Sequence, residues 1–579
     1  MNIFKKRISL SASIIIVFLI TIPLLNFNHH NYSKGDGVII WDVKSYYAYL
    51  PAAFIYNDLS LDFMQDYPDK FGKWIWPIIT PTGKKAILTT MGLSVMYSPF
   101  FFIAHQYALR NAEFEPDGYS MPYHIALTFS AYVYFILALI LLRKLLLKYF
   151  TELSTAITLL AVGGGTNLLH YVTYSAPMSH AYNFFLIIAF VYLLERWYNT
   201  YKWSDTVLLG LTAGLISLIR PTNTIILLLI PFYQVYSFKS LRTNFCILLK
   251  RWSKLICITI AFILVWVPQF IYWYKVSGRI FYFSYEEVDS AFYFLNPQVF
   301  NILFSFKKGW YIYTPIMLLA TIGIYFLIKR KNPFAIGTSI YFIVNLYILS
   351  SWWSWWFGGG YGNRAFIDGY GIMAFPLAAL LDWNKKVNLK KIALVFLVLI
   401  LTALNIFQVQ QYRHGSIHYF WMNREAYWET FLRLKPTCKY WNILLQPNVE
   451  KARKGVYETT YFIDSNVTRE ELFNKLKSEV EKNAQLLDSL TILSQNTNNS
   501  IEELKEEHIN DKINSGLAQQ EYKELRIDYL KRQMRNCMTW KKEIERKARR
   551  NALTFDEMAT IEAERIFDKY SQKYLKEFY

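Results

Sequence analysis

The stretch SASIIIVFLITIPLLNF, residues 11–27, decides the fold, because an uncharged apolar run of this length crosses the hydrocarbon core of a bilayer as one helix. Basic residues at positions 5–7 precede it, as they would in a signal peptide. No small-residue cleavage pattern follows, so we interpret the run as a retained first membrane helix. Similar apolar runs recur as far as residue 409. The sequence therefore predicts an all-α polytopic membrane protein.

The composition agrees with a chain that lies largely in lipid. The chain has 579 residues, of which 54% are hydrophobic and 18% aromatic. Its formal net charge of +19 would suit a nucleic-acid partner, but the basic residues form short clusters beside apolar runs. Such clusters report membrane topology. We therefore expect membrane lipids as partners and no nucleic acid.

The basic clusters give a topology when all of them are placed in the cytoplasm together with the N-terminus. The clusters lie at 143–148, 195–202, 238–254, 329–331 and 384–391. About eleven transmembrane helices follow, at 8–25, 123–142, 152–171, 180–197, 205–219, 222–237, 255–273, 310–328, 333–351, 370–383 and 392–409.

This topology puts a long first loop, residues 26–122, on the extracytoplasmic side. Residues 88–107 are apolar enough to cross, but counting them as a span would move the cluster at 143–148 outside. We expect them to form an amphipathic or re-entrant helix at the outer surface. The short pair 205–219 and 222–237 is expected to be a hairpin that does not fully span.

Asp42 is the candidate catalytic residue, in WDVKSYYAYLPAAF (residues 41–54) of the first outer loop. If this stretch is helical, Asp42, Tyr46 and Tyr49 share one face. A carboxylate there could act as a general base toward a hydroxyl. The alternative is that Asp42 caps the helix, since aspartate is a favoured N-cap residue.

Two further candidates lie at the ends of predicted spans. Arg220, in SLIRPTNTIILL (217–228), is costly in an apolar hairpin unless it is paired, and its planar fork suits a phosphate. His180 begins a predicted helix, where a structural interfacial histidine is the alternative to a binding role. Both residues are candidates for substrate or lipid-phosphate binding, together with Tyr46.

The string WWSWWFGGGYGNRAF, residues 352–366, is the most unusual in the chain. An interfacial aromatic belt would explain its tryptophans but not its glycines. Glycines let backbone approach a ligand closely, so Gly362 is a binding candidate. Arg364 is a second candidate for an anionic group.

Several familiar site motifs are absent from the sequence. There is no GxxxxGK[ST], HExxH or GxSxG motif and no GxGxxG after a strand. Arg220 is nearly alone as a charged residue inside the predicted spans, whereas an ion-coupled transporter buries paired carboxylates near the midplane. A transporter or flippase of a polyprenyl-linked glycan remains the alternative function, and a non-catalytic membrane scaffold is a third.

At these residues the sequence resembles the GT-C class of integral-membrane glycosyltransferases, in particular those that use polyprenyl-phosphate sugars, such as protein mannosyltransferases and the aminoarabinose transferases of lipid A. The resemblance rests on Asp42 in a long outer loop, on Leu218, Arg220 and Pro221 as an L-x-R-P-like turn, and on a late G-x-x-x-G-x-R-like string. That string contains Gly358, Gly362 and Arg364, and the resemblance covers residues 8–409.

The resemblance implies that Asp42 deprotonates the acceptor and that Arg220 and Arg364 hold the lipid phosphate of the donor. The implied reaction moves a sugar from a polyprenyl-phosphate-linked donor to a hydroxyl of a lipid, glycan or protein acceptor, with inversion. Many relatives carry two adjacent acidic residues in the first loop, whereas here Val43 and Lys44 follow Asp42. We expect no cofactor and no metal, although a divalent cation stays open.

After residue 409 the composition becomes charged and helical. We expect a transmembrane domain over 1–409, a membrane-proximal cap over 410–465 and a helical C-terminal domain over 466–579, with the tail extracytoplasmic. Three helices are expected in that domain, beginning near Thr468, Ser500 and Thr554. Its basic segment, residues 518–550, is interpreted as part of a solvated bundle, with a lipid-facing helix as the alternative.

The four cysteines form no CxxC or metal-ligand spacing. We expect free thiols, with a Cys438–Cys537 pair as the alternative if the tail is extracytoplasmic. The abundance of Lys, Asn, Ile and Tyr favours a bacterial inner membrane.

Overall fold

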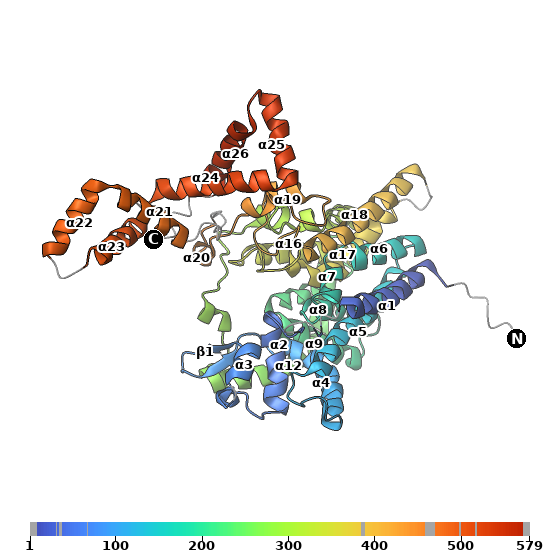
Figure 1. The fold of residues 1–579 in the computed structure, drawn as a ribbon. Coiled ribbons are helices and arrows are strands. Elements are labelled where there is room, and N and C mark those ends of the chain that lie inside the picture. The colour runs from blue at the N-terminus through green and yellow to red at the C-terminus, as the bar shows by residue number, and fades with distance from the viewer. Residues whose placement is uncertain are drawn as a thin grey trace. The chain divides into compact units, whose positions relative to one another are not determined.

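A computed structural model describes residues 8–29, 32–33, 37–66, 68–383, 388–457, 469–496, 500–515 and 518–570. The chain divides into two compact units, Met1–Val409 and Gln410–Tyr579. Helices dominate both units, and one two-stranded sheet is present in the described part of the chain (Figure 1). The predicted start of a tail helix at Thr468 lies outside the described residues.

Five helices of the described chain are long and apolar enough to cross a membrane, which makes the molecule an all-α polytopic membrane protein. They are α1 (Leu10–His29), α5 (Met121–Leu146), α12 (Trp252–Ser277), α17 (Tyr370–Leu381) with the preceding 3₁₀ turn η4 (Arg364–Gly369), and α18 (Leu389–Arg413).

Shorter helices complete the bundle of the first unit. They are α6 (Glu152–Gly164), α7 (Leu168–Thr173), α8 (His180–Thr200), α9 (Trp203–Ile219), η2 (Pro221–Leu228), α10 (Leu229–Phe232), α11 (Phe238–Lys250), α13 (Val299–Phe304), α14 (Trp310–Tyr313), α15 (Ile316–Lys329) and α16 (Ala335–Ser350).

Three predicted helices differ from the structure for local reasons. The predicted helix 152–171 is broken into α6 and α7, because the close packing of Gly165 against Ile316 and Thr402 leaves no room for a side chain. The predicted helix 222–237 begins as a 3₁₀ segment directly after Arg220, where Pro221 lacks a backbone donor. Most of the predicted loop 238–254 forms α11, which starts with a capping box at Ser237.

The segments predicted to be cytoplasmic lie together at one end of this unit. Arg143, at the end of α5, donates to the hydroxyls of Ser9 and Ser11 at the start of α1, at 2.8 and 2.6 Å. Lys148 pairs with Glu195 of α8 at 2.5 Å.

A buried carboxylate ties three more segments to the same end. Asp382, after α17, accepts from Thr151 at 2.7 Å and from Ser154 at 3.1 Å, both at the start of α6. Its other oxygen pairs with Arg330, after α15, at 2.9 Å, and Lys391 of α18 lies 4.0 Å away. The basic clusters thus share one end of the bundle, as the predicted topology requires.

The first outer loop folds into a small layer of its own. It contains α2 (Asp42–Phe54), η1 (Asp62–Gln65), α3 (Pro68–Trp74), β1 (Pro77–Ile79), β2 (Lys85–Ile87) and α4 (Gly92–Arg110). The two strands are antiparallel, with Ile78 opposite Ala86. Tyr47 of α2 packs edge-on against Phe101 and Tyr119, at ring-centroid distances of 6.0 and 5.7 Å. This aromatic core holds α2 against α4.

The helix α4 runs beside only the first half of α5. The Tyr134 hydroxyl donates to the carbonyl of Met96 at 3.1 Å, and the Tyr123 hydroxyl lies 2.6 Å from Nδ1 of His105. The basic end of α5, at Arg143, is therefore out of reach of α4. This arrangement agrees with the expectation that residues 88–107 do not form a full span.

The second unit is a set of short helices. They are α19 (Arg424–Thr430), η5 (Tyr440–Asn442), α20 (Val449–Arg453), α21 (Arg469–Lys482), α22 (Ala484–Asn496), α23 (Ile501–Asn514), α24 (Gln519–Asn536), α25 (Met538–Asn551) and α26 (Phe555–Tyr570). A core that includes Leu476, Ile513 and Tyr522 joins α21, α23 and α24.

Two expectations for the tail were wrong. Six helices stand in the described part of the tail where three were expected, because the chain also breaks at Asn483, between α23 and α24, and at Cys537, which has an extended backbone. Cys438 and Cys537 form a disulfide rather than two free thiols. The free-thiol prediction failed because 99 residues separate these cysteines and their approach depends on the folded tail. The basic segment 518–550 packs as α24 and α25 within a helical bundle.

Candidate functional site

Asp42 is the first residue of α2, and its side chain does not cap that helix. The N-cap position is Trp41, with φ of 52° and no side-chain capping bond. A left-handed conformation is uncommon for a tryptophan, and such conformations cluster at functional sites. The Asp42 side chain keeps 46% of its exposure. The capping alternative is thereby removed, and the carboxylate faces a different partner.

That partner is Arg364, from the glycine-rich string 322 residues later. Nη2 of Arg364 lies 2.8 Å from Oδ2 of Asp42. Arg364 opens the 3₁₀ turn η4, which the Asn363 side chain caps by accepting from the amide of Ala365. The structure thus brings the predicted base and one predicted phosphate-binding arginine into contact.

The turn before Arg364 depends on its glycines. Gly360 has φ of +144°, and a β-carbon there would stand 2.5 Å from the hydroxyl of Tyr171. Gly362 is buried, and a β-carbon on it would meet Tyr313 and Asn167 at 3.2 and 3.3 Å. These surroundings give Gly362 a role in shaping the turn, and its predicted contact with substrate stays a prediction.

Arg220 lies in the break between α9 and η2 and pairs with a carboxylate that the sequence did not single out. Its Nη1 is 3.4 Å from Oδ2 of Asp368, and its side chain retains 18% exposure. Asp368 is buried and also accepts from Asn223 at 2.7 Å and from Asn183 at 3.1 Å. Four elements therefore meet at one carboxylate.

His180, the first residue of α8, completes the shell around Asp368. Its Nδ1 lies 2.9 Å from Oδ1 of Asp368, and its side chain is 2% exposed. A histidine so placed holds the carboxylate that in turn orients Arg220. His180 therefore positions Asp368, and a direct contact with substrate or lipid phosphate stays a prediction.

Tyr46 connects the two ion pairs. Burial raises the pKa of its hydroxyl above the usual value, the positive charges of Arg220 and Arg364 oppose the rise, and Asp42 adds to it. The charges of Asp42, Arg220 and Arg364 therefore all act on the Tyr46 phenol. The same charges act on Tyr285, which lies between α12 and α13: burial raises its pKa, Asp42 adds to the rise, and both arginines oppose it.

Lys308 is a further basic side chain at this site, which the sequence patterns did not indicate. Its Nζ donates to the carbonyl of Gly360, and the side chain is buried. Burial and the nearby positive charges of Arg364 and Lys307 hold the pKa of Lys308 well below its usual value. An anion bound beside Gly360 would favour the charged form of this lysine.

Asp368 and Lys308 were not predicted from the sequence, and the sequence signals for them differ in strength. Asp368 follows Arg364 by four residues in NRAFIDG, a spacing that marks neighbours on a helical turn. Lys308 stands in a short basic pair before a predicted span, which resembles an ordinary topology signal. No three His, Cys, Asp or Glu side chains of the described chain are grouped as metal ligands. Metal independence stays a prediction.

Chemically, the site combines one partly exposed carboxylate with two guanidinium cations, a buried lysine and several buried tyrosines. A carboxylate accepts protons, and guanidinium groups bind phosphate through paired hydrogen bonds. Asp368 holds the guanidinium of Arg220 in place before any ligand binds, so this group needs little reorganisation when charge develops on a ligand.

No protein-family model and no curated protein matches this sequence. Three solved structures of the archaeal oligosaccharyltransferase AglB from Archaeoglobus fulgidus are similar to the chain, with 13–14% identity and TM-scores of 0.43–0.44. One holds an inhibitory peptide and dolichol-phosphate, one is the apo form, and one is tethered to an acceptor peptide. The matches cover 69–72% of this chain, which spans 55–58% of theirs.

Proposed function

We propose that this protein is a glycosyltransferase that moves a sugar from a polyprenyl-phosphate-linked donor to a hydroxyl of a lipid, glycan or protein acceptor at the extracytoplasmic membrane face. The observation that carries the proposal is the contact between Asp42 and Arg364 at 2.8 Å, with Arg220 acting on the same tyrosine. A base and two phosphate-binding groups are the parts that this reaction needs.

In the proposed step, the acceptor oxygen attacks the anomeric carbon of the donor while Asp42 takes the hydroxyl proton. The bond between that carbon and the phosphate oxygen breaks, and the electron pair leaves with the polyprenyl phosphate. One displacement inverts the anomeric centre. The leaving phosphate gains negative charge as the bond breaks, so Arg220 and Arg364 bind the transition state more strongly than the donor.

The ion pair gives donor binding a second consequence. When the donor binds, the guanidinium of Arg364 must exchange its contact with Asp42 for one with the donor phosphate. The Asp42 carboxylate is then free to accept a proton. Binding of the donor and activation of the base are thereby coupled. Because Asp42 is 46% exposed and the pair is partly solvated, breaking it costs about 0–1 kcal/mol.

The decisive variant is Asp42→Asn, which preserves size and removes the base. Transfer from a radiolabelled polyprenyl-phosphate sugar should fall by about 10²–10⁴-fold. Donor affinity, measured separately on the full chain in nanodiscs, should stay equal or rise, because Arg364 is released. Asp66→Asn, an exposed aspartate of the same loop, is the matched control and should leave both quantities unchanged.

Full sugar transfer by the Asp42→Asn protein would show that Asp42 is not the base. A flippase, the competing function, gives a different pattern in the same vesicles. It would move labelled donor across the bilayer without consuming it, and the movement would survive the loss of Asp42.

A further inference from the structure

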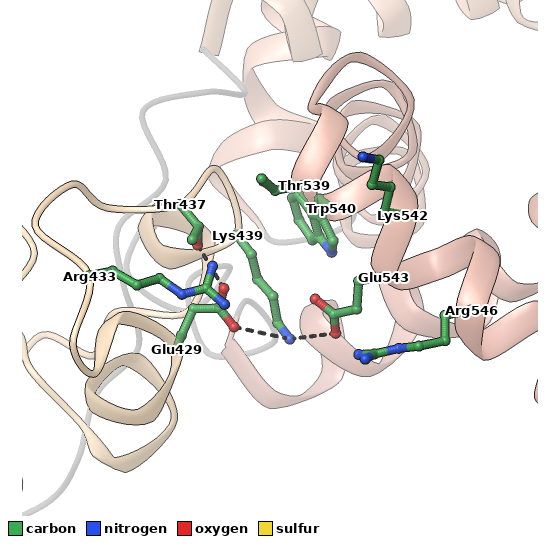
Figure 2. A pocket seen from close by; sticks show the side chains of 9 residues that line it. All are labelled: Glu429, Arg433, Thr437, Lys439, Thr539, Trp540, Lys542, Glu543 and Arg546. Carbon is green, nitrogen blue, oxygen red and sulfur yellow. Dashed lines mark hydrogen bonds and ion pairs between the residues drawn. The ribbon is translucent and has the colours of Figure 1, made fainter.

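A cavity of about 420 Å³ lies within the second unit, between the segment around α19 and helix α25 (Figure 2). Four basic side chains line it, and two acidic ones, Glu429 and Glu543. The basic residues are Arg433, Lys439, Lys542 and Arg546. The cavity is separate from the Asp42 site, and the reaction proposed there uses none of its residues.

The acidic side chains are already neutralised within the cavity wall. Lys439 lies between them, 3.1 Å from Glu543 and 3.7 Å from Glu429. Glu543 also pairs with Lys547 at 2.9 Å. Among the described residues no carboxylate forms an ion pair with the remaining three cations of the lining, Arg433, Lys542 and Arg546. The cavity therefore presents an excess of positive charge.

Trp540 supplies an independent sign of a missing ligand atom. Its side chain lines the cavity and is only 2% exposed. The buried indole N–H has no acceptor among the residues that the structure describes. Figure 2 shows the indole nitrogen at the end of the ring nearer to Glu543. Buried donors are almost always satisfied, so an unpaired one beside a cavity points to an acceptor that enters from outside.

The two walls are joined by a covalent bond. The disulfide between Cys438 and Cys537 links the residue before Lys439 to the start of α25. A second cavity of about 510 Å³ shares Lys542 and Arg546 and adds further basic side chains from the same helix. The basic surface is thus larger than a single small ion needs.

We propose that this cavity binds the phosphate group of a phosphorylated ligand, with Trp540, Arg433 and Arg546 as its donors. Four cations against two carboxylates leave a charge of +2 in the lining, which matches a phosphate monoester of about −1.5 to −2. The same group could arrive on a soluble sugar phosphate or on a lipid headgroup.

The test uses the full-length protein in phosphatidylcholine nanodiscs, titrated with glucose 6-phosphate in a calorimeter. Trp540→Phe keeps an aromatic ring and removes only the N–H donor, so affinity should fall about tenfold. Arg546→Gln should weaken binding by about tenfold or more. Lys541→Gln removes one charge from α25 outside the cavity lining and should bind like the wild type.

Nanodiscs that contain phosphatidic acid, whose headgroup is a phosphate monoester, distinguish the two sources of phosphate. Weaker apparent binding of glucose 6-phosphate in them assigns the site to a lipid headgroup, and unchanged binding assigns it to a soluble ligand. The proposal is overturned if the wild type binds no glucose 6-phosphate, or if Lys541→Gln loses as much affinity as Arg546→Gln. Equal thermal unfolding of the variants confirms that each is folded.

Discussion

Asp42 and Arg364 show how much one contact between distant residues adds to a sequence pattern. Each was a candidate on its own, the first from a helix start and the second from a glycine-rich string. The sequence does not show that 322 intervening residues bring them within 2.8 Å. Their contact depends on α2 resting on α4 and on the turn at Gly360, which are both tertiary features.

Replacing Asp368 should test whether this residue positions Arg220 without itself taking part in the reaction. Asp368→Asn leaves one side-chain NH₂ facing donors from Asn183, Asn223 or His180, so Arg220 loses its anchor. The affinity for the donor should fall about tenfold or more, and the free energy of unfolding should fall by about 1–3 kcal/mol. Equilibrium donor binding and chemical unfolding are the measurements.

The control for this variant is Asp382→Asn at the other end of the bundle. Asp382 is similarly buried and equally well bonded, to Arg330, Thr151 and Ser154. Its loss should reduce stability to a similar degree without changing donor affinity. If both variants bound donor equally poorly, the weakening would reflect global destabilisation, and the positioning role of Asp368 would be lost.

Gly360 should be intolerant of any side chain. Its φ of +144° is a glycine conformation, and an added methyl would collide with the Tyr171 hydroxyl and approach Arg364. Gly360→Ala should lower the free energy of unfolding by about 1–3 kcal/mol and reduce sugar transfer. Gly278→Ala also has positive φ but open space, so it should lose about 1 kcal/mol at most, with transfer intact. Equal transfer by the two variants would show that the turn does not support the site.

At the scale of elements, apolar length and basic clusters predicted the helices well where packing did not intervene. The long runs that became α5, α12 and α18 needed nothing beyond their own composition. The break between α6 and α7 depends on Gly165 meeting Ile316, and the break between α24 and α25 on a cysteine bonded to a residue 99 positions earlier. Neither partner is visible in a local window of sequence.

The packing of α25 against α26 should become less stable at acid pH. Glu562, with a side chain 5% exposed, pairs with Arg565 at 2.8 Å and with Lys547 at 3.1 Å. Burial tends to raise the pKa of Glu562, but these hydrogen bonds and charges outweigh it and hold the pKa below 4.5. The stabilisation is therefore present above about pH 4.5 and is lost as pH falls through the lower, folded-state pKa.

Hydrogen exchange of α25 and α26 peptides in the full chain, measured across this pH range, tests the prediction. Glu562→Gln should lower the free energy of opening of these helices by about 1–3 kcal/mol, so that their amides exchange faster already at pH 7. Their exchange should then depend less on pH. Glu564→Gln, an exposed neighbour on the same helix, should behave like the wild type. An acid response that survives in Glu562→Gln would assign it to other carboxylates.

For the whole molecule, the sequence predicted the fold class, and it identified the partly exposed candidate residues of the site more readily than the buried residues that hold them. Asp42, Arg220 and Arg364 stood out because charge beside apolar sequence is costly. Asp368 and Lys308 did not, because their partners lie far away in the sequence: Arg220 and His180 for Asp368, and the carbonyl of Gly360 for Lys308. A prediction from sequence therefore finds the exposed groups of such a site more readily than the buried groups that hold them.

The disulfide also bears on the orientation of the whole chain. A bond between Cys438 and Cys537 forms and persists in an oxidising compartment, whereas the cytoplasm generally keeps thiols reduced. The segments carrying basic clusters gather at one end of the bundle, and α18 leads from Lys391 at that end toward the tail. We therefore predict that the tail is extracytoplasmic and that the basic end is cytoplasmic.

Reporter fusions on either side of α18 test this orientation. Alkaline phosphatase, which is active only after export, should be active when fused after Gly455 and inactive when fused after Lys391. Green fluorescent protein should give the opposite pattern, because it fluoresces after folding in the cytoplasm. Active phosphatase at Lys391 would invert the topology, and would place Asp42, on the opposite end from the basic clusters, in the cytoplasm.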